Sequence, residues 1–168
     1  MKTQILGLYA HTLSEAEKLV ADVPDERFAE LPYPNAKHPA WVLTHLSVGS
    51  GMLAGCLRGD PKDLAGVPAS WSELGQPGGA VSGERSLYAG KDELLSTLRA
   101  VHGTLADLVG SMTDAQLDAE FVVPEWRDFF PTNAVAIAYM LGHHEGYHLG
   151  QLTQWRMAAG FGPAQGAF

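Results

Sequence analysis

Apolar residues in this chain recur at steps of three and four, and this spacing constrains its fold more than any other feature. Such spacing places apolar side chains on one face of an α-helix. It extends over four stretches, at about residues 2–22, 38–58, 91–110 and 132–160. No stretch shows the apolar and polar alternation that is typical of a strand. Four helices of this length without strands predict an all-α fold, a four-helix bundle.

Residues that end or begin helices mark the limits of these stretches. Pro24 stops the first helix, and Pro39 occupies the first helical position of the second, where its missing N–H group costs no hydrogen bond. Thr132 is the expected cap of the fourth helix. Residues 59–89 form a long loop rich in Gly and Pro, and such a loop in a compact domain is usually functional or mobile. We expect its Trp71 to lie over another part of the molecule.

The composition fits one compact domain, residues 1–168, with 46% apolar and 18% charged residues. The formal net charge is −8 and no basic cluster occurs, so we expect neither nucleic acid nor an anionic membrane surface as a partner. One cysteine, Cys56, cannot form an internal disulfide. The N-terminal apolar stretch is too short for a signal peptide, and the longest apolar run, residues 134–142, is about half a membrane span. We therefore expect a soluble, cytoplasmic protein that acts on a small molecule.

Two of the seven histidines, His144 and His148, fall within the apolar pattern of the fourth helix, between Leu141 and Leu152. They are one helical turn apart, so their Cβ atoms lie about 5–6 Å from each other. Buried imidazoles need polar partners, and a divalent metal ion satisfies both through one nitrogen each. This pair is therefore the first candidate for a metal site.

A third histidine, His45, lies on the apolar stripe of the second helix. Gly49 and Gly51 leave space beside it, although Gly in a helix interior costs about 0.5–1 kcal/mol relative to Ala. We therefore predict a metal site made by His45, His144 and His148, with a polar network in the core as the alternative. Three imidazoles suit zinc, nickel, copper and iron alike. We expect the other histidines at capping, surface or core-edge positions.

Residues 144–148 also read His-Glu-x-x-His, the motif of zinc metallopeptidases. In those enzymes a third ligand usually follows the motif, but no His, Asp, Glu or Cys follows His148 here. A di-iron site built on Glu145 and His148 would need further glutamates that face inward. The second helix contains no acidic residue, which excludes the di-iron site, and the missing third ligand argues against a metallopeptidase.

Two segments resemble the characteristic motifs of the DinB superfamily, which includes the YfiT-like metal-dependent hydrolases: residues 39–46, PAWVLTHL, and residues 144–152, HEGYHLGQL. The resemblance covers nearly the whole chain. It implies a bundle in up-down-down-up order and a divalent metal, zinc or nickel, held by His45, His144 and His148. It also implies a homodimer. Some members of the family transfer low-molecular-weight thiols such as bacillithiol, or use mycothiol in maleylpyruvate isomerisation.

Three neutral imidazoles leave one or two coordination positions open, as in catalytic metal centres. A metal held in this way can deprotonate a bound thiol or a bound water. Our leading hypothesis is a metal-dependent enzyme that transfers a low-molecular-weight, bacillithiol-like thiol to an electrophile. The alternatives are a metal-dependent hydrolase and a non-catalytic, metal-binding stress-response module. Gln151, Tyr147 and Glu145 are candidates to orient the bound ligand or to support the metal ligands.

The C-terminal segment is almost uncharged. Arg156 is the only charged residue after Leu149, and residues 161–168 are neutral and apolar. An exposed apolar surface of this kind commonly marks an interface. We therefore expect a homodimer that uses this segment, and the alternative is that it folds back onto the bundle of its own chain.

Overall fold

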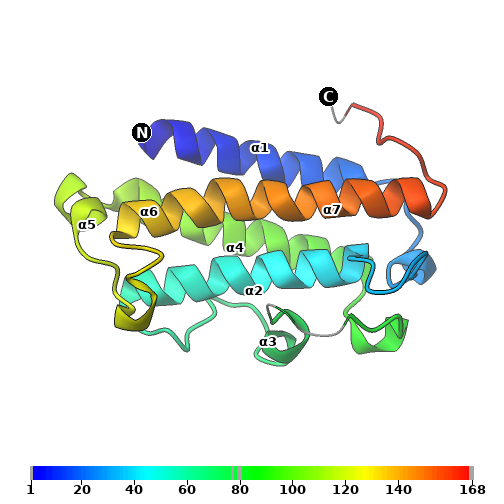
Figure 1. Ribbon diagram of the computed structural model, residues 1–168, viewed down its shortest axis with the longest axis horizontal. Coiled ribbons are helices and arrows are strands. Elements are labelled where there is room, and N and C mark those ends of the chain that lie inside the picture. Colours follow the sequence, from blue (N-terminus) through cyan, green and yellow to red (C-terminus); the bar gives the residue numbers. More distant parts are fainter. Residues whose placement is uncertain (1, 77, 79–80, 167–168) are drawn as a thin grey trace.

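The computed structural model describes residues 2–76, 78 and 81–166, and long helices dominate this part of the chain (Figure 1). They are α1 (Lys2–Val20), α2 (Pro39–Arg58), α4 (Lys91–Ser111) and a last helix formed by α6 (Asn133–Ala138), the π-helical segment η4 (Tyr139–His144) and α7 (Glu145–Ala158). Shorter helices lie in the connections: η1 (Asp25–Arg27), α3 (Trp71–Leu74), η2 (Arg85–Leu87), α5 (Asp114–Asp118) and η3 (Pro124–Trp126). No strand occurs in the described residues, so the all-α prediction is confirmed.

The long helices run up, down, down and up. In Figure 1, α1 runs from left to right, α2 and α4 both return, and the last helix runs in the direction of α1. Because the connection between α2 and α4 crosses back to the end where α2 began, these two helices are parallel neighbours, and they pack against each other. The arrangement agrees with the order expected for the family that the sequence resembles.

Capping residues define the ends of α2 and α6. Nδ1 of His38 accepts a hydrogen bond from the backbone N–H of Trp41 at 3.1 Å, and Pro39 follows His38 at the first helical position, as predicted. His38 is fully buried rather than solvated. Gly59 ends α2 with a φ of +86°, a left-handed conformation that favours glycine. Thr132 caps α6 through its hydroxyl, which confirms its predicted role.

α2 is the central helix of the core. Its mean hydropathy of 1.3 over an 18-residue window would suit a membrane span by length and composition, but 89% of that window is buried inside the bundle. Among the described residues, α2 is the only helix that meets this criterion. The burial of α2 explains its composition, because both of its sides pack against other helices.

A polar layer crosses the interior of the bundle. Tyr9, Ser50, His102 and Glu145 come one each from α1, α2, α4 and α7, and each is at most 4% exposed. The hydroxyls of Tyr9 and Ser50 share a hydrogen bond of 2.8 Å, and the ring of Tyr9 stacks on His102 at a centroid distance of 3.8 Å. Oε1 of Glu145 lies 3.3 Å from Nε2 of His102. These contacts link all four long helices through polar side chains in the interior of the bundle.

The connection between α2 and α4 lies directly on α2. At Gly51 a Cβ atom would overlap the backbone carbonyl of Leu64, so this glycine allows the loop to approach the helix closely. Trp71 in α3 is buried against the main core, which confirms that it lies over another part of the molecule. Residues 77, 79 and 80 of the predicted loop lie outside the described residues.

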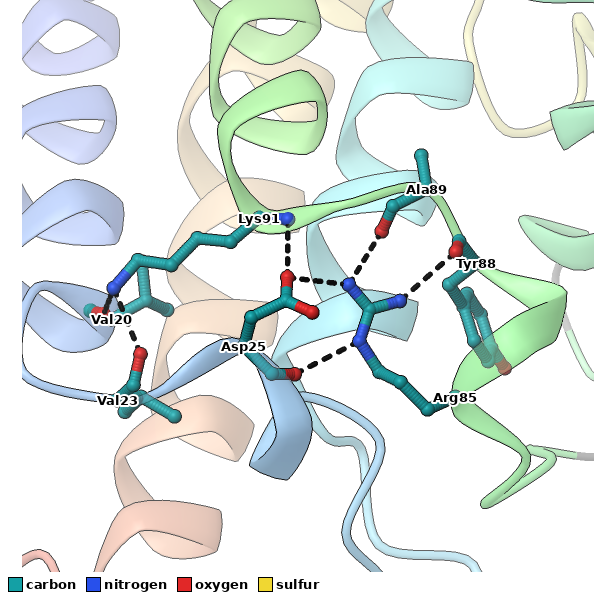
Figure 2. A network of polar contacts seen from close by, with 7 residues as sticks. All are labelled: Val20, Val23, Asp25, Arg85, Tyr88, Ala89 and Lys91. Carbon is teal, nitrogen blue, oxygen red and sulfur yellow. Dashed lines mark hydrogen bonds and ion pairs between the residues drawn. The ribbon is translucent and has the colours of Figure 1, made fainter.

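Polar contacts tie the end of this connection to the turn after α1 (Figure 2). The guanidinium group of Arg85 donates to the carboxylate and the backbone carbonyl of Asp25, and to two carbonyls of its own loop. The ammonium group of Lys91 donates to the carbonyls of Val20 and Val23 at 2.8 Å. The long connection is therefore bonded to the bundle at the point where α4 begins.

The C-terminal segment folds back onto its own chain. Phe161 stacks on Trp155 at a centroid distance of 5.6 Å, and Ala164 packs against the core. Arg156, which is 1% exposed, donates to both carboxylate oxygens of Asp22. Phe161 and Ala164 thus contact their own chain, and the homodimer through this segment stays a prediction. Residues 167 and 168 lie outside the described residues.

Candidate metal centre

His45, His144 and His148 meet where the second and last helices pack together. Each offers one ring nitrogen, and these three nitrogens lie within 4.8 Å of one another. Nε2 of His45 and Nε2 of His144 are 2.9 Å apart. The structure therefore brings together the three residues that the sequence singled out. In the described part of the chain, no other group of three His, Cys, Asp or Glu residues is arranged to hold a metal ion.

His144 is the last residue of the π-helical segment Tyr139–His144. A π-helical turn closes its hydrogen bond one residue further along the chain than an α-helical turn does, and such segments often occur at functional sites. After Leu141, the fully buried position is taken by Glu145, which is 1% exposed, whereas His144 is half-buried on the neighbouring face. The apolar spacing of the sequence predicts His144 itself on the buried stripe. That placement assumed unbroken α-helical periodicity, which the π turn interrupts.

A backbone carbonyl fixes the ring of His45. Nδ1 of His45 lies 2.7 Å from the carbonyl oxygen of Gly75, at the end of α3. Because a carbonyl only accepts hydrogen bonds, Nδ1 carries the proton and Nε2 keeps its lone pair for a ligand. A Cβ atom at Gly75 would come within 2.9 Å of Cγ2 of Val48, so glycine permits this close approach. Sequence reasoning missed Gly75, because a backbone carbonyl has no side-chain pattern.

The ring of His148 is fixed in the same way by Gln151. Nδ1 of His148 donates to Oε1 of Gln151 at 2.9 Å, one helical turn further along α7. This bond also leaves Nε2 of the ring without a proton. Supporting acceptors of this kind orient metal-bound histidines and raise their basicity. Gln151 was one of the three candidates for a supporting contact.

Burial keeps the three imidazoles neutral. Burial, together with the smaller effect of positive charge on neighbouring histidines, lowers the pKa of His144 to about 4 and that of His148 to about 3. Burial also lowers the pKa of His45, against the opposing effect of its bond to Gly75. At neutral pH all three rings are therefore in the form that binds metal ions.

The residues present fit a divalent metal ion such as zinc or nickel. Bonds of about 2.0–2.1 Å to a tetrahedral ion place two ligand nitrogens about 3.3 Å apart, and the observed separation of 2.9 Å between His45 and His144 is close to this value. In His45 and His148, Nδ1 is held in a hydrogen bond, so Nε2 is free to bind the metal ion. Imidazole ligands alone suit zinc and nickel equally well.

A pocket of about 620 Å³ opens beside the histidines. This volume is typical of sites that bind small molecules. Gly49 leaves room for the pocket, since a Cβ atom there would lie 3.2 Å from Cε of Met140 and 3.4 Å from Cε1 of His144. The ring of Trp41 stacks on that of His45 at 4.7 Å and forms part of the wall. Any open coordination position on this side would thus face a pocket for a small ligand.

The other two candidate residues lie in different surroundings. Tyr147 is exposed, lines the pocket and approaches the ring of His148 edge-on at 5.1 Å. Glu145 is not among the residues that line the pocket, and its carboxylate instead faces His102 in the polar layer. His102, expected at the edge of the core, is fully buried in that layer. The structure therefore brings Gln151 and Tyr147 to the histidines, but directs Glu145 into the bundle.

Comparison with known proteins identifies the family. A search of curated proteins gave no match. The family model of the DinB superfamily matches residues 8–152, a range that contains His45, His144 and His148 and extends into each of the four long helices. Because this match spans most of the 168 residues and includes the site just described, the chain belongs to the DinB superfamily.

Proposed function

We propose that this protein is a metal-dependent enzyme that transfers a low-molecular-weight thiol, such as bacillithiol, to an electrophile. The observation that carries the proposal is the position of three neutral imidazoles on the wall of a pocket of about 620 Å³. Sites with three protein ligands and an open side are typical of catalytic rather than structural metal centres. Zinc and nickel are the metals we propose.

A divalent ion bound by His45, His144 and His148 would favour the thiolate form of a thiol at neutral pH. Gly75 and Gln151 keep the rings of His45 and His148 in the orientation that binds it. In the transfer, the thiol proton leaves to solvent, the sulfur forms a bond to the electrophilic carbon, and the leaving group departs with the electron pair of the broken bond. The protein contributes position and desolvation, because the reactants are held in the pocket beside these rings.

The composition of the pocket favours thiol transfer over hydrolysis. A hydrolase needs a general base that can deprotonate or orient a water molecule beside the metal. None of the described residues that line the pocket is Asp or Glu, and its only imidazoles are the three proposed ligands. A thiol needs no such base once the metal lowers its pKa.

Metal content tests the site directly. We would measure zinc and nickel by elemental mass spectrometry on untagged protein that has not contacted a nickel column. The double variant His45→Ala/His148→Ala removes two ligands, and His143→Ala is its control, because His143 is exposed next to His144 and outside the cluster. We expect one metal per chain in the wild type and in the control, and none in the double variant.

Conjugation assays test the reaction. The metal-loaded proteins would be mixed with bacillithiol or cysteine and with monochlorobimane, and the fluorescent adduct followed over time. Acceleration by the wild type and by His143→Ala, but not by the double variant, would support thiol transfer. A wild type without metal, unchanged in thermal stability by zinc or nickel, would overturn the metal site. A metal-loaded protein that conjugates no thiol above background would overturn the transferase.

A further inference from the structure

We propose that the ligand of this pocket is an organic carboxylate and that Lys37 selects it by binding the carboxylate group. The proposal rests on the proposed function, because it takes the pocket beside the three histidines as the binding site. It adds the charge of the ligand and the residue that recognises this charge. Lys37 would thus determine the specificity of the pocket for charged ligands.

Lys37 contacts Trp41, whose indole ring in turn stacks on His45. Its ammonium nitrogen is 4.1 Å from the centre of the Trp41 ring, and the Trp41 ring stacks on that of His45, with 4.7 Å between centroids and an angle of 9° between planes. Lys37 and Trp41 both line the pocket. A ligand that reaches the histidines can therefore also reach the ammonium group.

Apart from its contact with the Trp41 ring, the ammonium group of Lys37 forms no ion pair and donates no hydrogen bond among the described residues. Nine of the eleven Lys and Arg side chains form an ion pair or donate a hydrogen bond, and the two exceptions are Lys37 and the exposed Lys62. Lys37 is half-buried, and burial lowers its pKa. A half-buried cation without a counter-ion is unfavourable, and a ligand anion would compensate it.

The rest of the pocket wall does not oppose an anion. The chain carries a net charge of −8, yet no Asp or Glu is among the described lining residues, and Lys37 is the only formally charged residue among them. A bound divalent cation would add positive charge to the same wall. The pocket thus differs in electrostatic potential from the acidic protein around it, and this difference favours the entry of anions.

The opposite end of the pocket is apolar. Met52, Leu64, Trp126 and Met140 line it there. Trp41 and Met52 are eleven residues apart on α2, which corresponds to about 16 Å along the helix axis. The histidines lie between these two ends, since His45 is one turn from Trp41. The pocket therefore fits a molecule with a carboxylate at the Lys37 end and an apolar part at the other.

Three small thiols of similar length and different charge test this selection: 3-mercaptopropionate, 2-mercaptoethanol and cysteamine. Cobalt(II) would be loaded into the site, and binding followed by the near-ultraviolet absorption of thiolate bound to cobalt. We expect the dissociation constant of 3-mercaptopropionate to be at least ten times lower than that of 2-mercaptoethanol, with cysteamine binding most weakly. The ratio of these two dissociation constants is compared between the wild type and each variant, because differences in thiol acidity affect this ratio equally in all of them.

Lys37→Gln should reduce this preference to less than threefold and leave the affinity for 2-mercaptoethanol within twofold. The matched control is Lys62→Gln, which removes the same charge from an exposed lysine beside Pro61 at the pocket, and should keep the full preference. Lys37→Arg should also keep it. An equal preference in the wild type and in Lys37→Gln would overturn the proposal.

A measurement without metal separates this proposal from the proposed function. In metal-free protein, we would follow the indole N–H resonance of Trp41 by NMR during titration with butyrate and with its neutral isostere butyramide. A shift with butyrate alone, absent in Lys37→Gln, would support carboxylate binding even if the protein bound no cobalt, and in that case the metal-dependent function would fail by itself. No difference between butyrate and butyramide in the wild type would overturn the role of Lys37.

Discussion

The backbone carbonyl of Gly75 accepts a hydrogen bond from Nδ1 of His45 over 2.7 Å, and this bond makes the connection between α2 and α4 part of the candidate metal centre. The same connection is bonded to the turn after α1 through Arg85 and Asp25 (Figure 2). The orientation of a proposed ligand therefore depends on residues that are distant from it in sequence. The loop rich in Gly and Pro thus supplies the hydrogen bond that orients His45.

Gly75→Ala should weaken zinc binding about tenfold or more, because removal of a supporting hydrogen bond typically costs 10- to 100-fold in metal affinity. The new Cβ atom would lie 2.9 Å from Cγ2 of Val48 and push the carbonyl away from His45. Competition with a chromogenic chelator measures the affinity. Gly103→Ala is the control, since a Cβ atom there meets nothing within 4 Å. Equal affinities in a folded Gly75→Ala protein would show that the carbonyl does not support the site.

Gln151→Leu should also lower zinc affinity about tenfold, because Nδ1 of His148 loses its acceptor. Gln151→Glu keeps an acceptor at the same distance and should retain or increase the affinity. Gln154→Leu, at an exposed position on the same helix, is the matched control. The same competition assay applies. A Gln151→Leu protein that binds zinc as tightly as the Gln154→Leu protein would contradict a supporting role for Gln151.

Glu145→Ala should destabilise the fold but spare the metal centre. Its carboxylate is buried opposite His102 and does not line the pocket. Removing one partner leaves a buried polar group unsatisfied, which typically costs about 1–3 kcal/mol. We expect a loss of this order in the free energy of urea unfolding, with zinc affinity within threefold of the wild type. Glu145→Gln is the milder variant for the affinity measurement, and exposed Glu125→Ala is the control for stability. A large loss of affinity in a stable Glu145→Gln protein would place Glu145 in the metal site instead.

Acid should destabilise the protein partly through His38. Burial lowers the pKa of His38 to about 4, from an ordinary value of 6.5. The unfolded chain therefore binds a proton more readily than the folded chain between these values, and stability falls as the pH falls from about 6.5 towards 4. For this one group the loss between pH 7 and pH 5 is about 1–2 kcal/mol.

His38→Asn removes this titration and keeps an acceptor for the backbone N–H of Trp41, because Asn is a favourable N-cap residue. Urea unfolding at pH 7 and pH 5 in the presence of EDTA measures the difference. We expect the decrease in stability to be smaller in His38→Asn than in the wild type by that amount. Replacement of the exposed His11 by Asn should leave the decrease unchanged. Identical pH dependence in all three proteins would contradict the burial of a neutral His38.

The helices and the three clustered histidines could be predicted from local patterns along the chain. Helix positions follow from local chemistry: the spacing of apolar residues, Pro39 at the start of α2 and Thr132 before α6. His45, His144 and His148 were recognisable because imidazoles at core positions need polar partners. Such information is contained within a few residues along the chain, so it can be read without knowledge of the tertiary structure.

The supporting contacts of these residues, and the pocket around them, could not be predicted in this way, because they arise from packing between distant segments. The bond between Gly75 and His45 joins residues 30 positions apart, and the π turn before Glu145 breaks the periodicity from which the face of His144 was inferred. Lys37 lines the pocket, where its ammonium group lies over the ring of Trp41. Such contacts depend on backbone atoms and on the packing of segments that are distant in sequence. Neither leaves a local residue pattern from which it could be predicted.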